Sequence, residues 1–154
     1  MQEIVQEIVE EKAQMIAGAA AIVMLLMLAG MHLYWAAGGK AGKGAAVPSA
    51  SGRPLMRPSV LGTAMVAVGL CVMAALLALR IGWLNVPALP GNGVVIEVGA
   101  WLIAAVFGLR AIGDFRYVGF FKRIRDSRFA RLDTLAYSPL CACLALLVGI
   151  SAGT

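Results

Sequence analysis

The sequence predicts an all-α polytopic membrane protein, in which four transmembrane helices form a compact bundle. Of the 154 residues, 61% are hydrophobic and 14% are charged, and the mean hydropathy is +0.87. Soluble domains are apolar over about half of their residues. Four apolar runs are each long enough to cross a bilayer, which takes about 20 helical residues. This composition excludes a soluble or disordered chain, and three cysteines cannot form a fully paired disulfide scaffold.

The first span, at about 15–36, begins at Met15 and ends before Gly38 and Gly39, which a helix tolerates poorly. The preceding segment, 1–14, places apolar residues opposite glutamate and glutamine at helical spacing. It is therefore expected to form a short, acidic amphipathic helix on the outer membrane surface. A cleavable signal peptide begins with a basic region, so these glutamates indicate that the first span is retained.

The other three spans are predicted at about 59–79, 94–113 and 134–152. Pro58 precedes the second span, and a proline- and glycine-rich turn at 87–93 precedes the third. Pro139 is expected in the first turns of the fourth span, where a missing backbone N–H does little harm. In lipid these runs must be helical, because unpaired backbone groups are costly there. Residues 15–154 are thus expected to form a single transmembrane domain.

Basic residues concentrate on one side of the membrane once four spans alternate. The connector between spans one and two holds four Lys and Arg residues, and the region from Arg110 to Arg131 holds seven of the 13 in the chain. The opposite side has only Lys12 and Arg80. Basic residues favour the cytoplasmic side. We therefore expect a bacterial inner-membrane protein with the loops 37–58 and 114–133 in the cytoplasm and both termini outside.

Small residues recur every four positions in the last three spans, and such ridges allow helices to pack closely in lipid. They predict close contact among spans two, three and four. The ridges are Ser59, Thr63, Ala67, Cys71 and Ala75; Ala100, Ala104 and Gly108; and Cys141, Ala145, Gly149 and Gly153.

Polar and aromatic residues gather at the cytoplasmic ends of spans one, three and four. Arg110 and Asp114 are four residues apart on one helix face, so they are expected to form an ion pair. Charged residues at a membrane boundary often mark functional sites. The candidate ligand-binding residues are His32, Tyr34, Trp35, Arg110, Asp114, Arg116, Tyr117, Asp133 and Tyr137.

The segment 120–132 alternates apolar and basic positions. Its basic side chains are expected to reach the phosphates of lipid headgroups, each attracted by about 1 kcal/mol at an anionic surface. The candidates are Lys122, Arg123, Arg125, Arg128 and Arg131. Because no nucleic-acid-binding fold accompanies this basic segment, lipid is the expected partner and nucleic acid is not.

Four strings carry a resemblance to a known family. They are HLYWAAGG at 32–39, Arg57-Pro58, RAIGDFRYVGFFKR at 110–123 and FARLDTLAYSPLC at 129–141. From Met15 onward the chain resembles a family of small bacterial four-helix integral membrane proteins, domain of unknown function 3995. The resemblance implies the four-helix membrane fold and brings no activity, ligand or catalytic residue.

The sequence lacks a nucleophile elbow, a phosphate-binding glycine loop and zinc-ligand spacing. We therefore expect a non-enzymatic membrane protein, without metal or cofactor, that binds a lipid or another anionic or membrane-soluble ligand at its cytoplasmic polar cluster. One alternative is a membrane enzyme or a quinone or haem redox component that uses His32. Another is a structural subunit of a membrane complex. The expected partners are membrane lipids and either a second copy or another membrane protein.

Overall fold

The computed structural model describes residues 1–50, 53–85 and 91–153. It confirms the all-α membrane fold, because four helices are long and apolar enough to cross a membrane. They are α1 (Gln2–Ala36), α3 (Val60–Arg80), α4 (Asn92–Ile112) and a fourth built from α5 (Arg128–Leu132), the π-helix η1 (Asp133–Tyr137) and α6 (Ser138–Ala152). The chain is thus a multi-pass integral membrane protein.

The connector between α1 and α3 contains only short elements. The one-turn helix α2 (Lys43–Ala46) is followed by β1 (Ser49–Ala50) and β2 (Arg53–Pro54). The two strands pair antiparallel, with Ser49 opposite Pro54. The serine hydroxyl of Ser59 then accepts a hydrogen bond from the N–H of Gly62 at 3.0 Å, which caps the start of α3.

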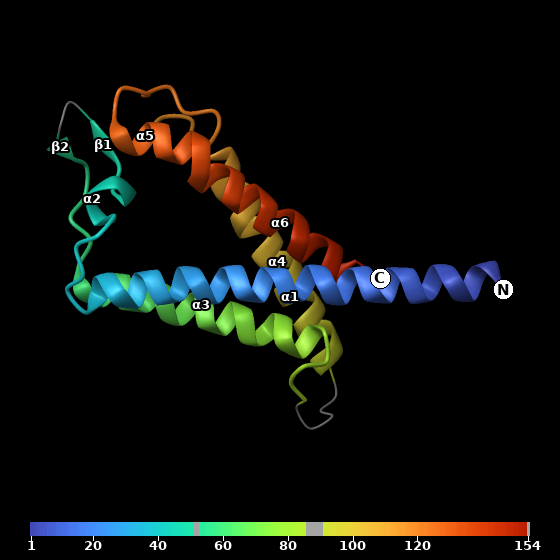
Figure 1. The fold of residues 1–154 in the computed structure, drawn as a ribbon. Coiled ribbons are helices and arrows are strands. Elements are labelled where there is room, and N and C mark those ends of the chain that lie inside the picture. The colour runs from blue at the N-terminus through green and yellow to red at the C-terminus, as the bar shows by residue number, and fades with distance from the viewer. Residues whose placement is uncertain (51–52, 86–90, 154) are drawn as a thin grey trace.

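Helix α1 differs from the sequence-based expectation because it includes the acidic segment 1–14 without interruption. That segment contains no proline or glycine, and its glutamate, glutamine, alanine and lysine residues are good helix formers. Nothing in it ends or bends the helix. Residues 1–13 are all exposed, and Figure 1 shows this part of α1 extending past the rest of the molecule.

The fourth helix also begins earlier than expected, at Arg128, where the Ser127 hydroxyl accepts a hydrogen bond from Ala130 N–H at 3.0 Å. Pro139 consequently lies inside the helix rather than in its first turns. A proline has no N–H, and its ring clashes with the carbonyl four residues earlier. The chain accommodates it by widening into the π-helical turn η1 directly before α6, a local change often found at functional sites.

The bundle consists of two helix pairs. Helix α1 packs mainly on α3, and α4 packs mainly on α6, with α1 also touching α6. Figure 1 shows that the pairs cross and then separate toward the end that carries α2, α5 and the two strands. Fully buried Leu25, Leu77, Leu144 and Val148 form the apolar core together with many alanines.

The small-residue ridges predicted the packing only in part. Thr63 and Ala67 are buried, but Cys71 and Ala75 on the same predicted ridge are exposed. The buried face of α3 continues through Leu70, Ala74 and Leu77, at alternating spacings of three and four. A straight α-helix has 3.6 residues per turn, so a strict four-residue ridge drifts off the contact face. Spans three and four pack closely as expected, as α4 on α6, but span two is misplaced, because α3 packs mainly on α1 and hardly touches α6.

The two pairs are joined where they cross, near the C-terminus of the chain. A Cβ at Gly18 of α1 would lie 2.7 Å from the Ser151 hydroxyl of α6, so these helices approach closely here. The Gln14 side-chain amide donates a hydrogen bond to the carbonyl of Gly153, and Arg80 Nη2 donates to the carbonyl of Ala152 at 3.3 Å. Polar bonds thus tie α1, α3 and α6 together at this end.

Candidate functional site

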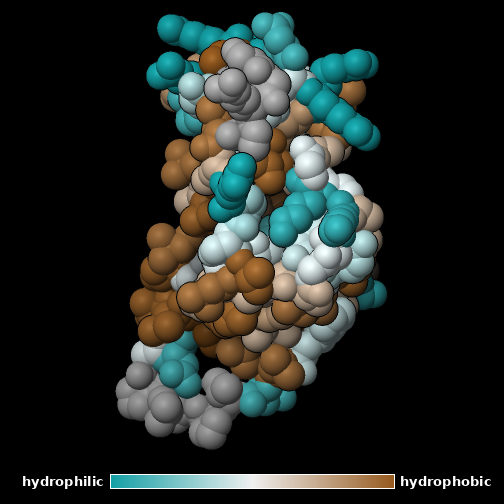
Figure 2. Space-filling view, turned by 90° about the vertical axis from the view of Figure 1, so that its left-hand side faces the viewer, coloured by the Kyte–Doolittle hydropathy of each residue, from teal (hydrophilic) through white to brown (hydrophobic). Residues whose placement is uncertain are grey.

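Basic residues collect at the other end of the bundle, formed by the connector 37–58, the loop 113–127 and α5. We call this the basic end. Figure 2 looks at the molecule from this side and shows hydrophilic side chains projecting around the top, where Figure 1 places α5 and the loop. Below them, hydrophobic side chains cover the left of this view, and pale or hydrophilic side chains lie at its centre and right.

A buried carboxylate organises this end. Asp133, at the start of η1, is 0% exposed, and its two oxygens have different partners. Oδ1 accepts a hydrogen bond from Arg110 Nη2 of α4 at 2.9 Å. Oδ2 accepts from Lys122 Nζ at 2.9 Å and from the N–H of Gly119 at 2.7 Å. One side chain therefore connects α4, the loop and the fourth helix.

Lys122 points inward and is only 1% exposed. Its ammonium group donates to the Asp133 carboxylate, to the Gly119 carbonyl at 3.0 Å and to the Thr134 hydroxyl at 2.6 Å. An ammonium has three donors, so each has a partner. The expectation that Lys122 reaches lipid headgroups is wrong, because its charge is neutralised inside the fold.

The expected Arg110–Asp114 ion pair is also wrong. Arg110 pairs with Asp133, while Asp114 lies beyond the end of α4 and its Oδ1 accepts three backbone N–H groups. These belong to Arg116, Tyr117 and Val118, at 2.9, 2.6 and 2.9 Å. Helix α4 ends at Ile112, and Gly113 turns the chain with a φ of 92°. Asp114 therefore leaves the helical face that the spacing rule assumed.

We predict that the contribution of Asp114 to stability depends on pH. Desolvation raises the pKa of its carboxyl group, but the N–H groups of Val118, Tyr117 and Arg116 together lower it below its ordinary value. A carboxyl group that is more acidic in the folded state stabilises that state above the ordinary pKa of about 3.9, and the stabilisation disappears as the pH falls through the folded-state pKa. The melting-temperature difference between the wild type and Asp114→Asn should be constant from neutral pH to about pH 5 and shrink below pH 4. A difference that grows on acidification would contradict this assignment.

The aromatic residues at the end of α1 are bound to the chain that follows them. The Trp35 indole N–H donates to the Ala41 carbonyl at 2.7 Å, and the Tyr34 hydroxyl accepts from the Ala41 N–H at 3.4 Å. His32 Nδ1 lies 2.8 Å from the Leu28 carbonyl, which can only accept, so Nδ1 carries the proton. These contacts fix the start of the connector.

Tyr137 links the connector to the fourth helix. Its hydroxyl donates to the Ala45 carbonyl of α2 at 3.4 Å, and its ring lies 6.0 Å from the ring of buried Phe129. The connector therefore bridges the two helix pairs at the basic end.

In the loop, Arg116 lies over the ring of Tyr117, with its guanidinium carbon 5.2 Å from the ring centroid.

The candidate ligand-binding residues thus form separate groups rather than one cluster. One group is at the end of α1, a second surrounds Asp133, and a third is the loop around Asp114. Within the described ranges, no hydrogen bond, ion pair or ring contact joins the first group to the others. Figure 1 shows the reason, because α1 and α4 lie far apart at the basic end.

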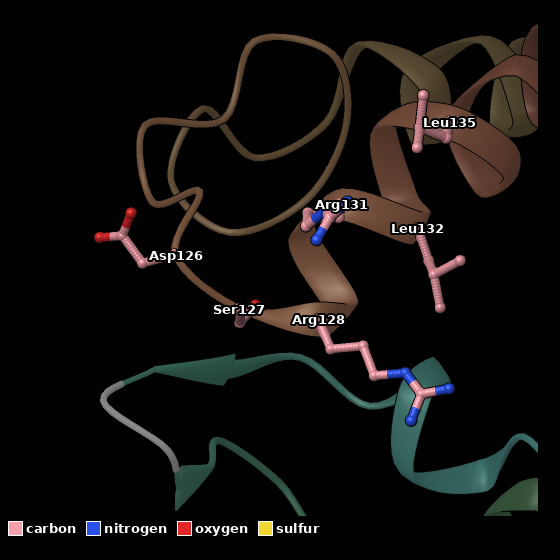
Figure 3. A pocket seen from close by; sticks show the side chains of 6 residues that line it. All are labelled: Asp126, Ser127, Arg128, Arg131, Leu132 and Leu135. Atoms are coloured by element: carbon pink, nitrogen blue, oxygen red, sulfur yellow. The ribbon is translucent and has the colours of Figure 1, made fainter.

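A pocket of about 440 Å³ lies beside the start of the fourth helix. Two arginines and two leucines of one helix line it together with the turn before that helix, and the lining residues are Asp126, Ser127, Arg128, Arg131, Leu132 and Leu135. Figure 3 shows the Arg128 side chain extending toward α2 and the Asp126 carboxylate pointing away from the other five side chains. We call this the arginine pocket. Among the described residues, neither of its guanidinium groups has a hydrogen-bond or ion-pair partner.

A second, open groove of about 490 Å³ lies on the connector. It includes Lys43 of α2 and Arg57, whose side chains are basic like those of the arginine pocket. The remaining headgroup candidates differ in availability. Arg123 and Arg125 are both exposed, but Arg125 Nε also donates to the Lys122 carbonyl at 3.3 Å.

The role of Thr134 and the inward direction of Lys122 were not predicted from the sequence. Asp133 was expected at a membrane boundary, where a carboxylate requires a cationic partner. The sequence did not indicate which of the seven nearby Lys and Arg residues is that partner. The backbone N–H of Gly119, the third partner, carries no side-chain signal at all.

Residues 25–148 match a family described as "Protein of unknown function (DUF3995)". This range includes the Asp133 network, the arginine pocket and all four strings on which the resemblance was based. No curated protein and no solved structure matches the chain.

Proposed function

The chain belongs to this family of unknown function, and from that premise we propose that it binds anionic lipid headgroups in the arginine pocket. The observation that carries the proposal is a pair of guanidinium groups, from Arg128 and Arg131, that have no partner among the described residues. Free arginines at the boundary of a membrane span fit phosphate oxygens, because the planar guanidinium donates two parallel hydrogen bonds.

The leucines of the pocket fit the other part of a lipid. Leu132 and Leu135 follow the arginines by about one turn, on the side toward the apolar helix α6. Leu135 is 74% exposed, which suits contact with hydrocarbon rather than water. A phosphate at the arginines would therefore have its acyl chains beside the leucines. A free inorganic phosphate would contact only the two arginines and would leave the leucines without a ligand.

The ion pairs of Asp133 with Arg110 and Lys122 hold in place the helix that carries the pocket residues. Asp133 follows Leu132 directly, and its bonds to Arg110 and Lys122 hold the helix start against α4 and the loop. Binding sites work best when their side chains stand on an element that is itself held in place. In this proposal Arg110, Asp133 and Tyr137 position the pocket, and Arg128 and Arg131 contact the lipid.

We further propose that the basic end faces the cytoplasm of a bacterial inner membrane. The distribution of Lys and Arg supports this orientation. It would put the termini outside and present the arginine pocket to the inner leaflet, where anionic lipids attract basic segments by about 1 kcal/mol per charge.

Replacing both pocket arginines should weaken lipid binding. We expect Arg128→Ala/Arg131→Ala to bind phosphatidylglycerol about thirtyfold more weakly, because two interactions of about 1 kcal/mol each are lost. Native mass spectrometry of the purified protein, titrated with phosphatidylglycerol and separately with inorganic phosphate, measures both affinities. Tighter binding of the lipid than of phosphate would assign the leucines to the acyl chains.

Lys40→Ala is the matched control for this experiment. Lys40 is an exposed cation at the same end and lines neither the pocket nor the groove. The control should keep the wild-type affinity. An equal loss of binding free energy per removed charge in the control and in the double variant would show a diffuse charge effect and would contradict a specific pocket.

A further inference from the structure

The N-terminal third of α1 carries an apolar stripe with no partner in the described chain. Its 13 first residues are all exposed, and Ile4, Val5, Ile8 and Val9 are between 46% and 61% exposed. A 35-residue helix is about 52 Å long, while the hydrocarbon core is about 30 Å thick. The stripe on this extension therefore faces water, where an apolar surface favours a protein partner.

Val5 and Val9 of this stripe begin the repeat of a coiled coil. Steps of four and three residues alternate without a break from Val5 to Leu33, and every position is exposed except Ala19, which is half-buried. This period of 3.5 residues is that of the a and d positions of a heptad. The positions are Val5, Val9, Lys12, Ile16, Ala19, Val23, Leu26, Gly30 and Leu33. We call them the α1 seam.

The residue types of the seam favour a coiled coil of two helices, that is, a dimer. In this register Val9, Ile16 and Val23 occupy three of the four a positions, and Leu26 and Leu33 occupy two of the five d positions. β-Branched residues at a with leucine at d favour parallel dimers. Two copies inserted in the same membrane with one orientation must place their α1 helices parallel, so the required geometry follows from membrane insertion. A two-fold axis along the membrane normal would relate them.

Charge and packing also fit this arrangement. Glu3, Glu7, Glu10 and Glu11 fall on positions b, f, b and c, which lie outside the seam. The acidic residues of two copies would therefore point away from each other. In the membrane the same outer positions carry Ala17, Ala21 and Leu25, which are buried against the rest of the bundle. The seam thus points away from the chain's own core along its whole length.

We propose that the α1 seam is an interaction surface for a second copy of this chain, forming a parallel two-stranded coiled coil that continues from the membrane into the aqueous phase. Lys12 is the only charged residue in the seam and would lie beside its counterpart. A polar residue inside a coiled-coil seam fixes the register and weakens the association. Lys12 thus makes the dimer weaker than the apolar positions alone would.

Cysteine cross-linking tests this interface in membranes. The exposed Cys71 and Cys143 are first replaced by alanine. In this background Val5→Cys or Val9→Cys should yield a disulfide-linked dimer on oxidation, because facing seam residues are within the roughly 4.4–6.8 Å Cα separation that a disulfide spans. Glu7→Cys and Glu10→Cys, on outer positions, are the matched controls and should stay monomeric. Absence of seam cross-links, or equal cross-linking at both sets, would overturn the proposal.

A second measurement distinguishes two arrangements of the N-terminal part of α1: pairing with a second copy through the seam, or lying on the membrane surface. Lys12→Leu should lower the dissociation constant of the dimer at least tenfold, measured by energy transfer between labelled copies diluted into phosphatidylcholine vesicles, while Glu10→Leu should not change it. A fluorophore at Val5→Cys that is quenched by a quencher attached to lipid headgroups would place the extension on the membrane and contradict the seam. All these positions are exposed, so the variants should keep the wild-type melting temperature.

Discussion

Asp133→Asn is expected to destabilise the protein more than any other single change of charge. The substitution leaves the buried ammonium of Lys122 without a counter-ion, and the asparagine amide has one accepting oxygen where the carboxylate has two, one for Arg110 and one for Lys122. Removing one partner of a buried ion pair costs about 3–5 kcal/mol, because the remaining charge is left uncompensated. Thermal unfolding of the detergent-purified protein measures the loss.

Two further variants complete a thermodynamic cycle. Lys122→Met should be less harmful, because Asp133 keeps its bond to Arg110 and to the Gly119 N–H. Combining Lys122→Met with Asp133→Asn should recover part of the stability that Asp133→Asn alone loses, because no buried ammonium remains. Asp126→Asn, an exposed carboxylate at the same end, is the control and should leave the unfolding temperature unchanged. If the losses of unfolding free energy in the two single variants simply added up in the double variant, direct coupling between Lys122 and Asp133 would be contradicted.

Gly119→Ala is expected to have the second large effect. Gly113 and Gly119 face each other across the loop with φ values of 92° and 90°, a conformation that disfavours side chains. A Cβ on Gly119 would overlap the carbonyl of Ile112 and the Cα of Gly113. The expected loss is about 3 kcal/mol, because the unfavourable φ and the overlap add. The change would also move the Gly119 N–H away from Asp133.

Gly69→Ala is the matched control for this substitution. Gly69 lies inside α3, and a Cβ there meets nothing within 4 Å. Alanine also favours a helix interior over glycine by about 1 kcal/mol. We expect Gly69→Ala to keep or raise the unfolding temperature, measured as for Gly119→Ala. If Gly119→Ala unfolded at the wild-type temperature, the close contact of the two glycines would not be needed for the fold.

Much of the fold could be predicted because breakers mark the spans. Pro58 and the proline- and glycine-rich sequence at 87–93 place the starts of α3 and α4 within two residues of the observed ones. The errors lie where no breaker stands. Nothing separates the segment 1–14 from the first span, so the two form one helix, and the fourth helix begins at Arg128 because Ser127 caps it earlier than the hydrophobic run suggests.

The candidate site was predicted less well, because its contacts are not local. The four-residue rule paired Arg110 with Asp114, but the observed partner of Arg110 is Asp133, 23 residues along the chain. Which cation turns inward depends on the path of the loop, and two glycines with positive φ set that path. The pocket itself was not predicted. Arg128 and Arg131, which line it, belong to the segment 120–132 that alternating apolar and basic positions singled out.

The inward position of Lys122 has a consequence for how the protein is made. During biosynthesis, lysines and arginines near a span retain their loop on the cytoplasmic side. Lys122 can contribute to that decision only while the chain is still extended and its charge is exposed. Once Lys122 is buried and paired with Asp133, it no longer contributes to the surface charge of the protein. In the proposed orientation, the same residue would thus act first in keeping its loop on the cytoplasmic side and then in holding the folded loop to the fourth helix.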